Sequence, residues 1–75
     1  MPKLPRITPR RLLKILIKLD FYVHHQSGSH VNLRNNFKNH IHIVIPIHSR
    51  ELAPKTLKSI LVQAEVTIEE IIDLI

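Results

Sequence analysis

Isoleucine occupies every second position from residue 41 to residue 47, within the stretch IHIVIPIH. Side chains of a β-strand alternate between two faces, so this pattern predicts a strand with one buried face. Two earlier segments alternate in the same way, one with Phe21 and Val23 and the other with Val31 and Leu33. We therefore expect three antiparallel strands between residues 21 and 48, with turns at residues 27–29 and 35–39. The first turn is expected to be a three-residue loop in which Gly28, the only glycine, has a positive φ.

The segments on both sides of the predicted sheet have helical periodicity instead. Thr8 and Pro9 are typical of a helix start, and this helix is expected to end near residue 19 or 20. A second helix is expected from Pro54 and a third after Thr67, which has Glu70 at the spacing of a capping box. The predicted apolar faces are Leu12, Leu13, Leu16, Ile17 and Leu19 in the first helix, Leu57, Ile60, Leu61 and Ala64 in the second, and Ile68, Ile71, Ile72 and Ile75 in the third.

This order of elements predicts an α+β domain of the form α-β-β-β-α with an additional short C-terminal helix. The helices would pack on one face of a three-stranded antiparallel sheet and leave the other face open. A chain of 75 residues suffices for one domain, residues 1–75, so any cleft is expected to be shallow. The chain has no cysteine, which excludes disulfides and thiolate ligands. We recognise no signal peptide and no membrane-spanning segment, so we expect a cytoplasmic protein that does not bind membranes.

Charge is distributed unevenly along the chain. Residues 1–50 have a net charge of +8 and residues 51–75 a net charge of −3, which gives the total of +5. A basic body of this kind favours a polyanionic partner, most commonly nucleic acid. In the first helix Arg10, Lys14 and Lys18 follow one another at intervals of four residues, with Arg11 beside them, so they would form one basic stripe. A merely solvent-exposed surface has the same pattern, and the stripe alone does not distinguish the two.

Strand alternation also gathers polar side chains on the open face of the predicted sheet. If Val31 and Leu33 face the helices, then His30 and the residues that share its parity face away. His25 is expected at the rim, and a loop at residues 27–29 would place Gln26 opposite His30 and His24 opposite Asn32. His48 would approach His30 from the end of the third strand. The predicted open face comprises Tyr22, His24, Gln26, His30, Asn32, Arg34, His40, His42 and His48.

Three chemistries could use histidines on such a face. A metal site could combine His40 with His42 or His24 with His30, but the sheet has no cysteine, aspartate or glutamate to complete it. A serine hydrolase built from Ser27 or Ser29 with His30 lacks an orienting acid. RNA cleavage without metal fits best, because RNA supplies its own 2′-hydroxyl nucleophile and needs only a proton-transfer group and cations. The alternative is that an exposed strand face simply tolerates histidines.

Three motifs resemble those of a known family, in its order and approximate spacing. They are Gly-Ser-His at residues 28–30, Pro-x-His-Ser at residues 46–49, and Thr-Leu-x-Ser-Ile-Leu-x-Gln-Ala at residues 56–64. From about residue 7 to the C-terminus, the chain resembles the HicA toxins of bacterial and archaeal toxin–antitoxin systems. The resemblance implies a double-stranded-RNA-binding-like fold and an endoribonuclease that cuts messenger RNA and thereby arrests translation and growth.

The resemblance also implies roles for particular residues and partners. The catalytic histidine of the family falls on His30, which a turn containing Gly28 and Ser29 would present. Apart from the resemblance, the predicted register makes His48 our candidate for a second proton-transfer group. No metal or cofactor is expected. An antitoxin of the HicB family is implied as the partner that binds the toxin, masks the histidine and forms an oligomer with it. We expect the RNA to be held by Arg10, Lys14, Lys18, Arg34, Lys55 and Lys58.

At three positions the chain departs from the family pattern. Members commonly carry glycine where this chain has Asp20, Lys55 and Glu65. These are turn and helix-cap positions, so we expect the departures to affect local geometry more than chemistry, while Lys55 could add a phosphate contact. Two other functions stay open: a module that binds A-form RNA through its shape and phosphates without cleaving it, and an inactive relative that only engages an antitoxin.

Overall fold

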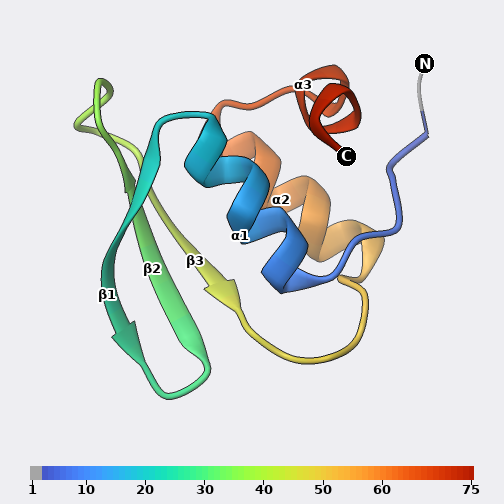
Figure 1. Cartoon of the computed structure of the whole chain (residues 1–75), viewed down its shortest axis with the longest axis horizontal. Helices are drawn as coiled ribbons and strands as arrows, with labels where there is room; N and C mark the ends of the chain where they lie inside the picture. The colour runs from blue at the N-terminus through green and yellow to red at the C-terminus, as the bar shows by residue number, and fades with distance from the viewer. Residues whose placement is uncertain (1–2) are drawn as a thin grey trace.

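Three helices and three strands follow one another in the predicted order (Figure 1). The computed structural model describes residues 3–75, so residues 1 and 2 of the predicted domain lie outside the described part. The elements are α1 (Pro9–Lys18), β1 (Phe21–Ser27), β2 (His30–Asn35), β3 (His42–Pro46), α2 (Pro54–Ala64) and α3 (Ile68–Leu74). The α+β class and the α-β-β-β-α order with a further C-terminal helix are thereby confirmed. Among residues 3–75, we find no helix with the length and hydrophobicity that a membrane-spanning segment needs.

The sheet has the order β1-β2-β3, and both strand pairs are antiparallel. All three helices lie on one side of this sheet (Figure 1), which leaves the other face open as predicted. The core fills the space between the two layers. Its buried residues are Ile7, Leu12, Ile15, Leu16, Phe21, Val31, Leu33, Ile41, Ile43, Ile45, Leu52, Leu57, Ile60, Leu61, Ala64 and Ile71. Each aliphatic side chain removed from water in this way contributes about 1.5–3 kcal/mol to the stability of the fold.

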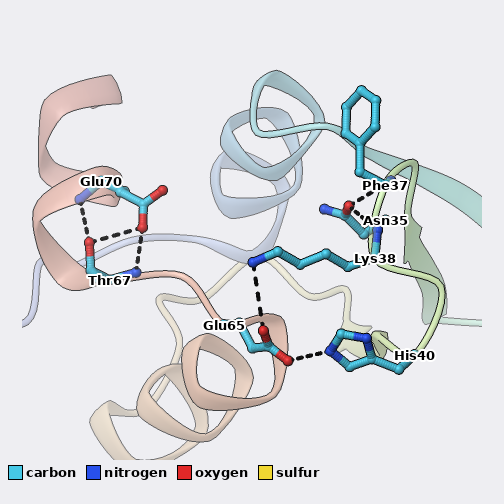
Figure 2. Close-up of polar contacts among 7 residues, drawn as sticks. All are labelled: Asn35, Phe37, Lys38, His40, Glu65, Thr67 and Glu70. Atoms are coloured by element: carbon cyan, nitrogen blue, oxygen red, sulfur yellow. Dashed lines mark hydrogen bonds and ion pairs between the residues drawn. The ribbon is translucent and has the colours of Figure 1, made fainter.

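The helix starts match the sequence signals. The Thr8 hydroxyl accepts a hydrogen bond of 3.4 Å from the backbone N–H of Arg11, and Pro9 occupies the first position of α1. At α3 the capping box is complete, because the Thr67 hydroxyl accepts from the Glu70 N–H and the Glu70 carboxylate accepts from the Thr67 N–H (Figure 2). These contacts satisfy backbone donors that have no partner inside the helix.

The predicted apolar faces of α1 and α3 need correction. In α1 the buried side chains include Ile15 together with Leu12 and Leu16, whereas Ile17 is 49% exposed. The buried stripe follows i, i+3, i+4 spacing, and Ile17 lies about 200° around the helix from Ile15.

In α3 only Ile71 is buried, with Ile68 and Leu74 packed partly against the core. Ile72 and Ile75 were predicted to be apolar contacts but are exposed. The reason is that α3 packs along α1 at the end of the chain, so a single narrow stripe of its surface is covered.

The pairing of β1 with β2 differs from the predicted register. Val23 pairs with Leu33 and His25 pairs with Asn32, so His24 is an extra residue that forms a β-bulge. Beyond the bulge, Ser27 lies opposite His30, and the loop contains two residues, Gly28 and Ser29, in place of the three predicted. Gly28 has φ +57°, which confirms the predicted positive φ and suits the first central position of a type II′ turn.

Candidate active site

One edge of the molecule gathers four chain segments: the β1–β2 turn, the end of β3, and the N-termini of α1 and α2. In Figure 1 the β1–β2 turn is at the lower left, the end of β3 and the start of α1 lie to its right, and α2 starts at the right-hand side of the view. The connectivity explains this arrangement, because α1 runs opposite to β1, β3 ends where β2 begins, and α2 starts after the connection at residues 47–53. A helix N-terminus carries partial positive charge from unpaired N–H groups. This edge, which we call the basic edge, is therefore suited to an anionic ligand.

His30 is the first residue of β2, the central strand, and it lies at the basic edge. Its neighbours across the sheet are Ser27 on β1 and Pro46 on β3. The next residue, Val31, is buried against the helices, so strand alternation directs His30 to the open face, where its side chain is exposed. The backbone carbonyl of Ser29 accepts a 2.6 Å hydrogen bond from the N–H of Ile47, which ties the turn to the segment after β3. The imidazole thus has a fixed backbone and open access to solvent.

The register places further polar groups on the same open face as His30. Asn32 lies two residues along β2, and its Oδ1 is 3.1 Å from Nε2 of His42 on β3, which confirms that both face away from the helices. Arg34 pairs with Tyr22 on one side and His42 on the other. The Nε of Arg34 is buried and has no hydrogen-bond partner within residues 3–75. Imidazole, amide, phenol and guanidinium groups therefore line the face beyond His30, as predicted.

The bulge reverses the predicted positions of two histidines. We expected His24 on the open face opposite Asn32 and His25 at the rim, but His25 is the residue that pairs with Asn32. Residues directly opposite each other in an antiparallel pair share a face, so His25 joins His30 on the open face. The same shift pairs Gln26 with Val31, whose side chain is buried, so Gln26 does not lie opposite His30. Strict alternation along β1 gave the wrong result because it assumed that no residue was inserted.

His48 lies beside the β1–β2 turn, close along the chain to a residue bonded to that turn. It directly follows Ile47, whose N–H is bonded to Ser29, and its side chain is exposed. The partner of His30 on β3 is Pro46, two residues earlier. No hydrogen bond links the two imidazoles within the described residues. The structure thus brings His48 to the same edge without joining it to His30.

His40 lies away from the open face, in contrast to the prediction. It belongs to the loop between β2 and β3, and its Nε2 is 2.5 Å from Oε2 of Glu65 at the C-terminal end of α2 (Figure 2). Lys38 reaches the other carboxylate oxygen of Glu65 at 3.6 Å. The hydrogen bond from His40 is the main cause that lowers the pKa of Glu65 below its usual value, and the positive charge of Lys38 adds to it. This Lys38–Glu65–His40 cluster links the loop to α2, and no sequence pattern predicted it.

The six predicted RNA-binding cations fall in three places. Lys55 and Lys58 are exposed near the start of α2, at the basic edge, and Arg34 lies on the open sheet face. Arg10, Lys14 and Lys18, together with Arg11, line a groove of about 380 Å³ between α1 and the last turn of α3. We call it the α1–α3 groove. The sequence predicted the stripe on α1 but gave no sign that α3 would lie beside it.

No group of three histidine, aspartate or glutamate side chains within residues 3–75 is placed to hold a metal ion. What the open face offers is an exposed imidazole at the start of a strand, with the Arg34 guanidinium of the same strand on the same face. Imidazole transfers protons near neutral pH, and cations stabilise a negatively charged phosphorane. The arrangement is therefore suited to chemistry on a phosphodiester.

Comparison with known proteins gives one family match. A family described as the HicA toxin of bacterial toxin–antitoxin systems matches residues 9–66 of the 75-residue chain. The matched segment runs from the start of α1 through α2 and includes the Gly-Ser-His turn; α3 lies beyond it. A comparison with curated proteins finds no match.

Proposed function

Because the chain belongs to the HicA toxin family of bacterial toxin–antitoxin systems, we propose that it is an endoribonuclease that cleaves messenger RNA and inhibits translation and growth. The observation that supports this most directly is the position of His30. It is an exposed histidine at the start of the central strand, on the open face of the sheet, at an edge with two helix N-termini. The histidine of the Gly-Ser-His motif thus occupies a place that a nucleic acid can reach.

The proposed reaction uses the 2′-hydroxyl of RNA as the nucleophile. This oxygen loses its proton as it attacks the adjacent phosphorus, the bond to the 5′-oxygen breaks, and that oxygen takes up a proton. The products are a 2′,3′-cyclic phosphate and a 5′-hydroxyl end, with no net change in protons. His30 transfers one of the two protons, and His48 is the candidate for the other. Neither step requires a metal ion.

Substrate binding is proposed to come from cations on the sheet face of His30 and on the helices. Lys55 and Lys58 extend from the first turns of α2, where the helix dipole also favours a phosphate. Arg34 lies on the same sheet face as His30, and Arg10, Lys14 and Lys18 lie along α1. Such contacts hold the ribose-phosphate backbone irrespective of base sequence.

The partner is proposed to be an antitoxin of the HicB family, encoded as a separate chain. It would form an oligomer with the toxin in the cytoplasm and cover the open face around His30, so that RNA is excluded. A neighbouring reading frame for such an antitoxin would support this part of the proposal. A toxin that remains fully active on RNA when saturated with its antitoxin would contradict the masking of His30.

Replacement of His30 by alanine tests the proposed activity. The His30 side chain is exposed and makes no hydrogen bond within residues 3–75, so His30→Ala is expected to fold normally. We expect it to abolish cleavage of single-stranded RNA and growth arrest on expression, a loss of at least about a hundredfold in rate. The control is His24→Ala, which removes an exposed imidazole from the bulge and is expected to keep the wild-type rate.

The assay should contain excess chelator, and its products should be examined for cyclic phosphate ends. Cyclic phosphate from the wild type and none from His30→Ala supports the proposal. Wild-type rates from His30→Ala would disprove the assignment. RNA that is shifted in a gel but stays intact would identify a binding module without nuclease activity, the alternative that this fold also allows.

A further inference from the structure

The α1–α3 groove is an unusually basic hollow with a small apolar floor. Arg10, Arg11, Lys14 and Lys18 come from α1, and Ile15 and Leu74 supply the aliphatic surface. The four cations lie within nine residues of one helix, so they span about 12 Å along its axis. Cations held this close together repel one another unless an anion lies between them.

No acid of the described chain neutralises the groove. The ion pairs found within residues 3–75 both involve Glu65, at the far end of α2. The acids of α3 that could have approached, Glu69, Glu70 and Asp73, are exposed and form no ion pair with α1. The positive charge of the groove is therefore available to a ligand.

The helix α3 makes the groove and lies outside the family match. The match ends at residue 66, whereas α3 spans Ile68–Leu74. Ile71 is buried and anchors the helix against the core, and Leu74, one turn later, forms the wall that faces the cations of α1. Without α3, the cations would form an exposed stripe on α1. The C-terminal helix turns that stripe into a bounded site.

We propose that the α1–α3 groove binds the ribose-phosphate backbone of the RNA strand that is cleaved at His30, on one flank of the cleavage site. This inference rests on the proposed function and adds a substrate subsite to it. The groove begins next to Arg10, near the N-terminus of α1. An RNA strand bound at His30 would therefore pass around the basic edge and enter the groove beside Arg10. Arg10, Lys14 and Lys18 follow at steps of about 6 Å along the helix, a repeat that suits successive phosphates.

The composition of the groove favours RNA over an acidic peptide. A peptide helix that binds in a groove needs several apolar contacts at i, i+3, i+4 and i+7 along its length. Here the aliphatic surface comes from Ile15 and Leu74, and Ile15 is almost fully buried. That is enough to contact a sugar or the face of a base, whereas the four cations match a chain with a charge on every unit.

A charge introduced into the wall of the groove tests the proposal. The probe is a ten-nucleotide 2′-O-methyl RNA, which cannot be cleaved because it lacks the nucleophile. Leu74→Glu places a carboxylate among the cations and is expected to weaken binding at least about tenfold. The matched control is Ile72→Glu, which adds the same charge to the same helix but on an exposed side about 200° away. It should change affinity less than about twofold.

Thermal unfolding of Leu74→Glu and Ile72→Glu shows whether α3 remains packed against α1.

A second test uses two variants outside α3. Lys14→Gln removes a cation of the groove and should weaken binding about threefold to tenfold. Arg6→Gln, which removes a cation from a separate hollow next to Glu51, should have little effect. Equal affinities for the wild type, Leu74→Glu and Lys14→Gln would overturn the proposal. So would a glutamate-rich peptide that binds the groove where the RNA does not.

The test separates this inference from the proposed function. If the 2′-O-methyl RNA binds through Lys14 but unmodified RNA is never cleaved, the groove is a backbone-binding site and the nuclease assignment fails. If unmodified RNA is cleaved in a His30-dependent manner while Leu74→Glu and Lys14→Gln bind and cleave like the wild type, the nuclease assignment holds and the groove proposal fails.

Discussion

Two residues, Asp20 and Glu65, adopt a left-handed backbone conformation that normally favours glycine. Their φ angles are 72° and 58°. Both positions were identified from the sequence as places where HicA toxins commonly have glycine, and the structure shows why: one is the turn between α1 and β1, and the other is the C-cap of α2. Lys55, the third such position, has no positive φ, because it lies within the first turn of α2. A side chain in the left-handed region costs about 1–2 kcal/mol.

Glycine substitutions at these two positions should have different effects on stability. The side chain of Asp20 makes no hydrogen bond or ion pair within residues 3–75, so Asp20→Gly removes strain. The larger backbone entropy of glycine in the unfolded chain opposes this gain, which leaves about 0.5–1 kcal/mol of stabilisation. Glu65→Gly should not stabilise, because it also removes the contacts of Glu65 with Lys38 and His40. Urea unfolding of both variants measures the difference, and equal stabilisation would contradict a role for the cluster.

The Lys38–Glu65–His40 cluster should make stability depend on pH in the acid range. The hydrogen bond from His40, aided by Lys38, lowers the pKa of Glu65 in the folded protein. A carboxyl whose folded pKa is depressed stabilises the fold above its unfolded pKa, and this contribution is lost as the pH falls through the folded value. The melting temperature of the wild type should therefore exceed that of Glu65→Gln at neutral pH, and the difference should vanish once the pH has fallen below the lowered pKa of Glu65. A difference that persists at the lower pH would show that the charge of Glu65 is not its cause.

At the scale of elements, the sequence predicted the order and type of all three helices and all three strands. The alternation of isoleucine predicted the third strand, and the capping residues Thr8 and Thr67 predicted the starts of two helices. The bulge at His24 could not be predicted, because an inserted residue is visible only from the partner strand, and neither glycine nor proline marks it. The buried face of the short helix α3 was also predicted wrongly. Its four isoleucines point in several directions around the helix, and only the contact with α1 determines which of them are buried.

The bulge leads to a prediction about which histidine of β1 assists at the open face. His25 pairs with Asn32 and shares the face of His30, about 7–8 Å away along the diagonal of the strand pair. If RNA lies on this face, His25→Ala should lower kcat/KM for RNA several-fold, mainly through KM. His24→Ala, the neighbouring substitution in the bulge, should have little effect. Strict alternation predicts the reverse order of the two variants, so the same pair of rate measurements distinguishes the observed register from an unbroken strand.

At the scale of the whole molecule, the fold converts an uneven charge along the chain into distinct surfaces. The basic first two thirds of the chain form α1 and the sheet, whereas most acids belong to the C-terminal segment with α3. The connectivity then places the N-terminus of α1 on the side of the molecule where β3 ends, with the N-terminus of α2 farther to the right in Figure 1. Charge along the sequence predicted a polyanionic partner. It could not predict the α1–α3 groove, which requires two helices 50 residues apart to lie side by side.

Binding of RNA to the basic surfaces of the protein should weaken steeply as the salt concentration rises. The slope of log affinity against log salt concentration is proportional to the number of phosphate contacts. For a single strand, the logarithm of affinity falls by about 0.7 per phosphate contact for each unit in the logarithm of salt concentration. Lys55 and Lys58 extend from the start of α2 into solvent, so each is expected to make one such contact. The double substitution Lys55→Gln and Lys58→Gln should therefore reduce the slope by about 1.4, with 2′-O-methyl RNA as the ligand. Arg6→Gln should leave the slope unchanged. If affinity fell in the double variant while the slope stayed at the wild-type value, the two lysines would act by holding α2 in place and not by contacting phosphate.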